Sequence, residues 1–185
     1  MEAEIRPLQV PLVRRLEANL SKYLAVFRVS VASNMAYSLA ILFRALNMGV
    51  IVFVLSQLWH TTFALRGQTQ ISGYQAGDLI WYLIATEVLA MSLPPIGRTI
   101  DLEVRSGQLA YMLGRPCSYI LYHFSSYIGE RIVRIGVNIL VGCVLALIMV
   151  GPPHFSLWNL LGFIPVAFLA ISIDFVCYFL IGLLA

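Results

Sequence analysis

The stretch that decides the fold is ALNMGVIVFVLSQLWHTTFAL, residues 45–65, which contains no Asp, Glu, Lys or Arg. A helix needs about 20 consecutive apolar residues to cross the hydrocarbon core of a bilayer. Residues 79–97 form a second such stretch, in which Glu87 is the single charged residue. Residues 135–173 carry no charge and are too long for one crossing. We therefore expect two spans there, separated by the helix-breaking sequence GPPH at 151–154.

The composition is typical of a membrane protein. Apolar residues make up 60% of the chain, charged residues 11%, and the mean hydropathy is +0.86, whereas a soluble domain is about half apolar and about a quarter charged. The net charge of +3 is small and no basic run alternates with aromatic residues, so we expect no nucleic-acid partner. Cys117, Cys143 and Cys177 share no short spacing. We therefore predict neither a metal site nor a disulfide framework.

These patterns predict an all-α membrane protein consisting of a single transmembrane domain, residues 1–185. Its four transmembrane helices are expected at about 38–60, 78–96, 132–151 and 156–180. Helices are expected because every backbone polar group in lipid needs a partner within the protein.

The N-terminal segment, residues 1–35, is predicted to be an interfacial amphipathic helix rather than a span. Leu16, Leu20 and Leu24 repeat on one helical face, while Lys22 lies off that face. Such a helix buries its apolar stripe at the acyl boundary and leaves its cations at the lipid head groups. The alternative interpretation is an ordinary helix that packs on a soluble partner.

The basic residues are distributed unevenly along the chain. Five of the twelve Lys and Arg residues precede the first span and five more lie between Arg98 and Arg134, whereas Arg66 alone separates the first two spans. The positive-inside rule places the N-terminus and the segment after the second span in the cytoplasm. Residues 98–130 are thus predicted to be a cytoplasmic loop.

This loop carries the signals of two short helices. Thr99 is placed to cap the first helix, and Asp101 and Arg105 are spaced to pair at i and i+4. Gly107 is suited to end that helix in the left-handed conformation. A second apolar face follows, made of Leu109, Met112 and Leu113. We interpret the loop as a docking surface for a cytoplasmic partner; the alternative is a solvated connector.

Glu87 lies near the middle of the predicted second span, where an ionised carboxylate is costly unless it is paired or faces water. Two interpretations stay open for this residue. It lines a translocation path, or it forms a structural pair with Arg44 or with a polar residue of another helix.

Two stretches resemble a known family. The run IDLEVRSGQLAYMLGRPCSYILY, residues 100–122, follows a span that begins GYQAGDLIWYLIATEVL, residues 73–89. Together they resemble the membrane-spanning subunit of bacterial type-2 ATP-binding-cassette exporters, most closely the branch similar to daunorubicin-resistance permeases. The residues that carry the likeness are Ile100, Glu103, Arg105, Ser106, Gly107, Leu109, Leu113, Arg115 and Pro116.

The resemblance implies a function and partners. In this family a separate ATPase subunit binds ATP and magnesium, dimerises, and pushes on a short coupling helix of the permease. Residues 99–116 occupy that position, and the implied coupling residues are Asp101, Glu103, Arg105, Gly107, Arg115 and Pro116. A second copy of the permease, or a similar permease, would complete the transport unit in the bacterial cytoplasmic membrane. Because such permeases have six spans, we expect this chain to represent the first part of one.

The chain itself is not expected to be an enzyme or to hold a cofactor. Its first glycine is Gly49 and its one lysine is Lys22, so it contains no phosphate-binding loop of the form G-x-x-x-x-G-K-[ST]. No H-x-x-x-H, C-x-x-C or G-x-S-x-G motif is present. The alternative class is a membrane-embedded enzyme, for which Asp101 and Glu103 are the candidate acids at one membrane face, or a secondary transporter, whose typical internal repeat is not evident in the sequence.

Overall fold

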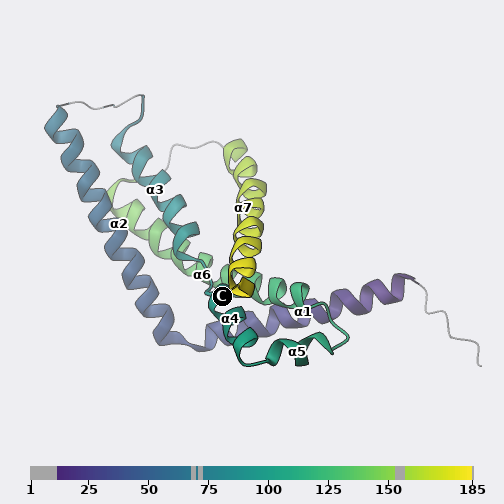
Figure 1. Ribbon diagram of the computed structural model, residues 1–185. Helices are drawn as coiled ribbons and strands as arrows, with labels where there is room; N and C mark the ends of the chain where they lie inside the picture. The colour runs from purple at the N-terminus through teal and green to yellow at the C-terminus, as the bar shows by residue number, and fades with distance from the viewer. Residues whose placement is uncertain (1–11, 68–69, 71–72, 153–156, 185) are drawn as a thin grey trace, which may run out of the picture.

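The computed structural model describes residues 12–67, 70, 73–152 and 157–184 (Figure 1). Within these ranges the chain forms helices and no β-strand, so the predicted all-α class is confirmed. The helices are α1 (Leu12–Ala36), α2 (Ser38–Arg66), α3 (Ala76–Met91), α4 (Ile96–Arg105), α5 (Gln108–Leu113), α6 (Tyr119–Met149) and α7 (Leu157–Leu184).

Four helical segments are long and apolar enough to cross a bilayer. They are α2, α3 together with α4, α6 and α7. Large apolar side chains are widely exposed along α2 and α7, as expected for helices whose solvent is lipid rather than water. The protein is thus a multi-pass membrane protein with an additional N-terminal helix, as predicted.

The short helices lie at one end of the molecule, away from the ends of α2 and α6 that lead into the next span (Figure 1). Helices α1, α4 and α5 gather at one end, together with the C-terminal end of α7. The ends of α2 and α6 that lead into the next span lie at the other end. This alternation agrees with the order of crossings predicted from the apolar stretches.

Helix α1 packs along the first half of α6. Ser125 donates a hydrogen bond from its hydroxyl to the Tyr23 carbonyl, and the Ser30 hydroxyl donates to the Ser126 carbonyl at 2.8 Å. The helices approach so closely at Gly129 that a Cβ atom there would lie 2.8 Å from the Phe27 carbonyl oxygen. Small residues permit this contact between helix backbones, so α1 is held by the chain's own α6.

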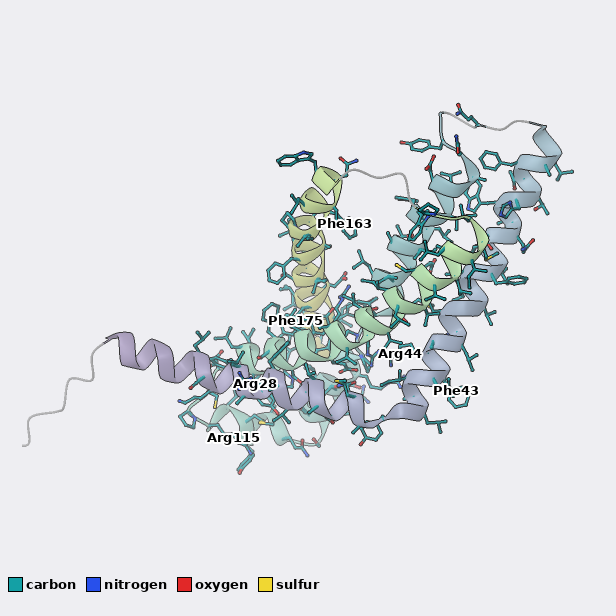
Figure 2. All side chains as sticks on the ribbon, turned by 180° about the vertical axis from the view of Figure 1, so that it is seen from behind. Arg28, Phe43, Arg44, Arg115, Phe163 and Phe175 are labelled. Carbon is teal, nitrogen blue, oxygen red and sulfur yellow. The ribbon has the colours of Figure 1, made fainter. Side chains whose placement is uncertain are left out.

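Two apolar clusters hold the spans together. The first joins α2, α3 and α6 through buried Met48, Val52, Ile80, Ile84, Val88 and Ala146. The second joins α4, α6 and α7 through buried Ile96, Ile100, Tyr127, Phe175 and Phe179. In Figure 2, Phe175 lies where α7 meets this second cluster, whereas Phe163 lies on the part of α7 that stands away from the other spans.

The predicted loop at 98–130 is too long, because α6 already begins at Tyr119. Residues 119–130 belong to the third span helix, which was predicted to begin at 132. The prediction placed Arg131 and Arg134 at the entry of that span. These charges are instead paired within the protein, so they do not require the helix to end.

The second span also differs from the prediction of 78–96. Helix α3 ends at Met91, and Pro94 and Pro95 separate it from α4, since a proline disfavours helix in the residue before it. Helix α4 begins at Ile96, so Thr99 lies inside the helix and does not cap it. The expected end at Gly107 is confirmed, because this glycine has a φ of 73°, in the left-handed region.

Candidate functional site at the junction of α3, α4, α6 and α7

The α3–α4 junction is stabilised by two arginines of α6. A helix leaves its last carbonyl groups without intrahelical donors, and cations are favourable at that end. Arg134 donates to the Leu93 carbonyl at 2.9 Å, and Arg131 donates to the Leu89 carbonyl at 3.4 Å. The two guanidinium groups therefore supply hydrogen-bond donors to carbonyl groups at the C-terminal end of α3, where the prolines interrupt the span.

Arg131 also connects α6 to α7. Its residue is only 2% exposed, and one guanidinium nitrogen lies 3.0 Å from the Asp174 carboxylate. A second nitrogen donates to the Tyr127 hydroxyl. A buried charge requires such partners because its desolvation is costly. Asp174, which lies on the predicted fourth span, is thus an interhelical ion-pair partner.

A second polar group lies further along the same side of α6. Arg134 pairs with Glu130 one turn earlier. Buried Asn138 donates to the Ser92 hydroxyl at 3.0 Å, and Ser92 in turn donates to the Val88 carbonyl. Polar side chains inside a helix bundle add directional contacts that apolar packing lacks. The C-terminal end of α3 is therefore bound to α6 at several points.

Glu103 links α4 to the beginning of α6. One carboxylate oxygen accepts a hydrogen bond from the Tyr119 hydroxyl at 2.7 Å, and the same oxygen lies 3.1 Å from His123 Nε2. The Glu103 side chain is only 13% exposed and that of His123 only 3%. Rings of Tyr119, Tyr122 and Phe179 surround the imidazole. The carboxylate of Glu103 thus points into the protein.

A pocket of about 190 Å³ lies beside this contact, between α4 and the first half of α6. Glu103, His123 and Glu130 contribute to its wall, and Pro94 and Pro95 contribute from the α3–α4 break. Among the described residues, no group of three or more His, Cys, Asp or Glu side chains is placed to hold a metal ion. The wall also carries hydroxyl groups, so the pocket is polar.

The predicted coupling residues divide between two environments. Asp101 and Arg105 form the expected pair one turn apart, with the Arg105 side chain 65% exposed. Arg115 and Pro116 are exposed beyond α5, and the Arg115 guanidinium lies 4.8 Å from the centre of the Tyr111 ring. Figure 2 shows Arg115 at the edge of the molecule. Only Glu103 faces inward.

The apolar face predicted for the second short helix is not covered by the chain's own helices. Helix α5 contains no buried residue, and Leu113 is largely exposed. Leu109 and Met112 are only half-buried. This face is therefore available to a partner or to the membrane surface.

The structure does not pair Glu87 with Arg44. Glu87 is half-buried on α3 and takes part in none of the ion pairs found among the described residues. Figure 2 shows Arg44 on the side of α2 that faces α6, opposite Phe43, and the charges that act on Arg44 belong to Arg134 and Glu130. Glu87 is therefore separate from the cluster at the junction.

The polar side of α6 was not predicted from the sequence. Tyr119, His123, Tyr127 and Arg131 follow one another at intervals of four residues, which places them on one helical face. This periodicity was available in the sequence. It was missed because residues 119–130 were interpreted as part of a loop, in which helical spacing has no meaning.

Comparison with known proteins identifies no relative: no family description, no curated protein and no solved structure matches this chain.

Proposed function

We propose that this chain is the membrane-spanning permease subunit of a bacterial type-2 ATP-binding-cassette exporter. It would lie in the cytoplasmic membrane with its N-terminus in the cytoplasm, beside a second permease copy or a similar permease. The observation that carries this proposal is α4, a ten-residue helix that follows the Pro94–Pro95 break in the second candidate span and lies at the α1 end of the molecule. The Arg-Ser-Gly and Arg-Pro residues that resemble this family lie at the end of α4 and just after α5.

The environment of α4 suits a helix that transmits force. Its inner side is bound to α6 through Glu103 and to α7 through buried Ile96 and Ile100. Its outer side presents the Asp101–Arg105 pair. A separate ATPase subunit that binds ATP and magnesium would contact this outer side and the exposed face of α5. A push on α4 would then move α6 and α7 together.

This arrangement changes the role proposed for Glu103. The resemblance suggests that Glu103 and Arg105 both contact the ATPase. Because the Glu103 carboxylate is held by Tyr119 and His123, we propose that it carries the displacement of α4 to α6. Asp101, Arg105 and Arg115 remain the charged residues proposed to meet the ATPase.

Gly107 provides the first test of coupling. Its φ of 73° strains any β-branched residue, and a Cβ atom there would meet no other atom within 4 Å. Gly107→Val should therefore change the α4–α5 turn without a steric clash. In the full-length permease, we expect normal insertion but loss of most transport-stimulated ATP hydrolysis. The measurement is ATPase activity and co-purification of the ATPase subunit.

The matched control is Gly136→Val, at a glycine that also has open space around it but lies in the middle of α6. It should insert and retain coupling. Unchanged ATPase stimulation in Gly107→Val would show that the α4–α5 turn is a passive connector. If no ATPase co-purifies with the wild-type permease either, a secondary transporter or a membrane enzyme becomes the better interpretation.

Labelling of single cysteines tests the proposed orientation. After replacement of Cys117, Cys143 and Cys177, a cysteine at Gln70 should react with an impermeant thiol reagent added to intact cells. A cysteine at Arg105 should react only after the membrane is opened, because the basic residues gather on the α4 side. The readout is the labelled fraction of each variant. Reaction of the Arg105 cysteine in intact cells would reverse the orientation.

A further inference from the structure

The pocket between α4 and α6 is a defined space rather than a surface depression on one helix. Its volume of about 190 Å³ equals that of roughly six water molecules in the liquid. Its walls come from the α3–α4 break, from α4 and from the first half of α6. The pocket is therefore large enough for a small polar molecule or for the head group of a lipid.

The charges around this pocket favour a cation. Two carboxylates, Glu103 and Glu130, line it, and the described residues of its wall include no Lys or Arg. Each carboxylate uses one oxygen within the chain, Glu103 toward Tyr119 and His123, and Glu130 toward Arg134. Among the described residues, the second oxygen of each has no hydrogen-bond partner. Because an ionised carboxylate only accepts hydrogen bonds, these oxygens are suited to a ligand that donates them.

The nearby arginines do not neutralise Glu103. Arg131 is directed to Asp174, to Tyr127 and to the Leu89 carbonyl. Arg134 is directed to Glu130 and to the Leu93 carbonyl. The pocket wall thus contains more negative than positive charge.

Aromatic rings complete the site. Tyr122, His123 and Tyr127 belong to the wall, and a cation within about 6 Å of a ring centre is attracted to the ring face. The chain already contains such a contact, since the Arg131 guanidinium lies 5.5 Å from the centre of the Tyr127 ring. The combination of carboxylates and aromatic rings is suited to organic ammonium groups.

We propose that this pocket binds a small organic ammonium group, in which Glu103 and Glu130 provide the charge and Tyr122 provides an aromatic wall. The group belongs either to a free amine or to the head group of an aminophospholipid. Bound there, it would bridge α4 and α6. This proposal does not depend on the proposed exporter function, because binding requires no ATPase subunit.

Titration of the purified full chain in mild detergent tests the proposal. Ethanolamine chloride, whose ammonium group donates hydrogen bonds, is added while calorimetry records binding, with sodium chloride at equal ionic strength as the reference. We expect saturable binding to the wild type. Glu103→Gln and Glu130→Gln should each weaken it by a factor on the order of ten or more, since each removes a charged contact.

Charge-matched and ring-matched controls separate binding from folding. Asp101→Asn removes a carboxylate from α4 outside the pocket, and should bind like the wild type. Tyr122→Leu should weaken binding severalfold, whereas Tyr82→Leu, at an exposed tyrosine of α3, should not. Helix content and monodispersity are recorded for each variant. If Glu103→Gln fails to fold, Glu130→Gln and Tyr122→Leu still decide the result.

Vesicles of defined composition distinguish the two sources of the ammonium group. Ethanolamine should bind the protein in phosphatidylglycerol vesicles. If the natural ligand is a lipid head group, vesicles that also contain phosphatidylethanolamine should block this binding; if it is a free amine, binding should be equal in both. Absence of saturable binding in detergent and in phosphatidylglycerol vesicles, or equal affinity in the wild type and the three pocket variants, would overturn the proposal.

Discussion

Arg131→Ala should lower the free energy of unfolding by about 3 kcal/mol, because it leaves Asp174 without its buried partner. The substitution also removes the donor to the Leu89 carbonyl at the end of α3 and the contact with Tyr127. The contacts that Arg131 of α6 makes with α3 and with α7 are therefore lost together. The measurement is unfolding of the purified protein in mixed micelles, followed by tryptophan fluorescence as the denaturing detergent is increased.

Arg105→Ala is the matched control for this experiment. It also removes an arginine from an ion pair, but this pair lies on the surface of α4 and its arginine side chain is 65% exposed. Exposed pairs of this kind contribute about 0.5 kcal/mol. A similar loss of stability in both variants would contradict the structural importance assigned to the Arg131–Asp174 pair.

A second substitution isolates the charge interaction. Asp174→Asn, introduced into the Arg131→Ala variant, removes the carboxylate that has lost its partner. The double variant should be more stable than Arg131→Ala alone, since an uncompensated charge is costlier than a neutral amide in this environment. The single variant Asp174→Asn completes the comparison. If the losses of stability in Arg131→Ala and Asp174→Asn simply add up to the loss in the double variant, the interaction between the two charges contributes nothing to stability.

The spans could be predicted from sequence because their signal is local. Residues 45–65 lack charges altogether, and α2 covers them. The turn at Gly107 was also predictable, since glycine tolerates the left-handed region that ends a helix. In both cases the determining property belongs to the residues themselves and needs no knowledge of what they contact.

The junction could not be predicted in the same way. A charged residue in the sequence indicates either an aqueous boundary or a buried pair, and the choice depends on its partner. Arg131 lies 43 positions from Asp174, so no local pattern connects them. The placement of Arg131 and Arg134 at the entry of the third span made that span too short and concealed the four-residue periodicity that begins at Tyr119.

Glycines present the same difficulty. Gly162 and Gly182 both lie within α7, and sequence alone assigns them the same low helix propensity. A Cβ atom at Gly162 would meet nothing within 4 Å, whereas one at Gly182 would lie 2.6 Å from the Gly97 carbonyl oxygen and 2.9 Å from Ile100 Cβ. Only the packing of α7 on α4 distinguishes a tolerant position from a restricted one.

Gly182→Leu should therefore separate α4 from α7. The atom nearest to the added side chain is a backbone oxygen, which cannot move without displacing α4 itself. Overpacking of a close helix contact typically costs about 1–3 kcal/mol, and we expect a loss of about 2–3 kcal/mol here because the small-residue contact is backbone to backbone. The same detergent titration measures it, and cross-linking between cysteines placed on α4 and α7 reports the separation of the helices.

Gly162→Leu is the control in the same helix, and its stability should stay within about 0.5 kcal/mol of the wild type. The pair also tests the proposed path of force. If α4 moves α7 through this contact, Gly182→Leu should reduce transport-stimulated ATP hydrolysis even at temperatures where the protein remains folded. Loss of stability with intact stimulation would confine the α4–α7 contact to a structural role. Force would then have to pass from α4 directly to α6, through Glu103 and the packing of Ile100 in the cluster with Tyr127.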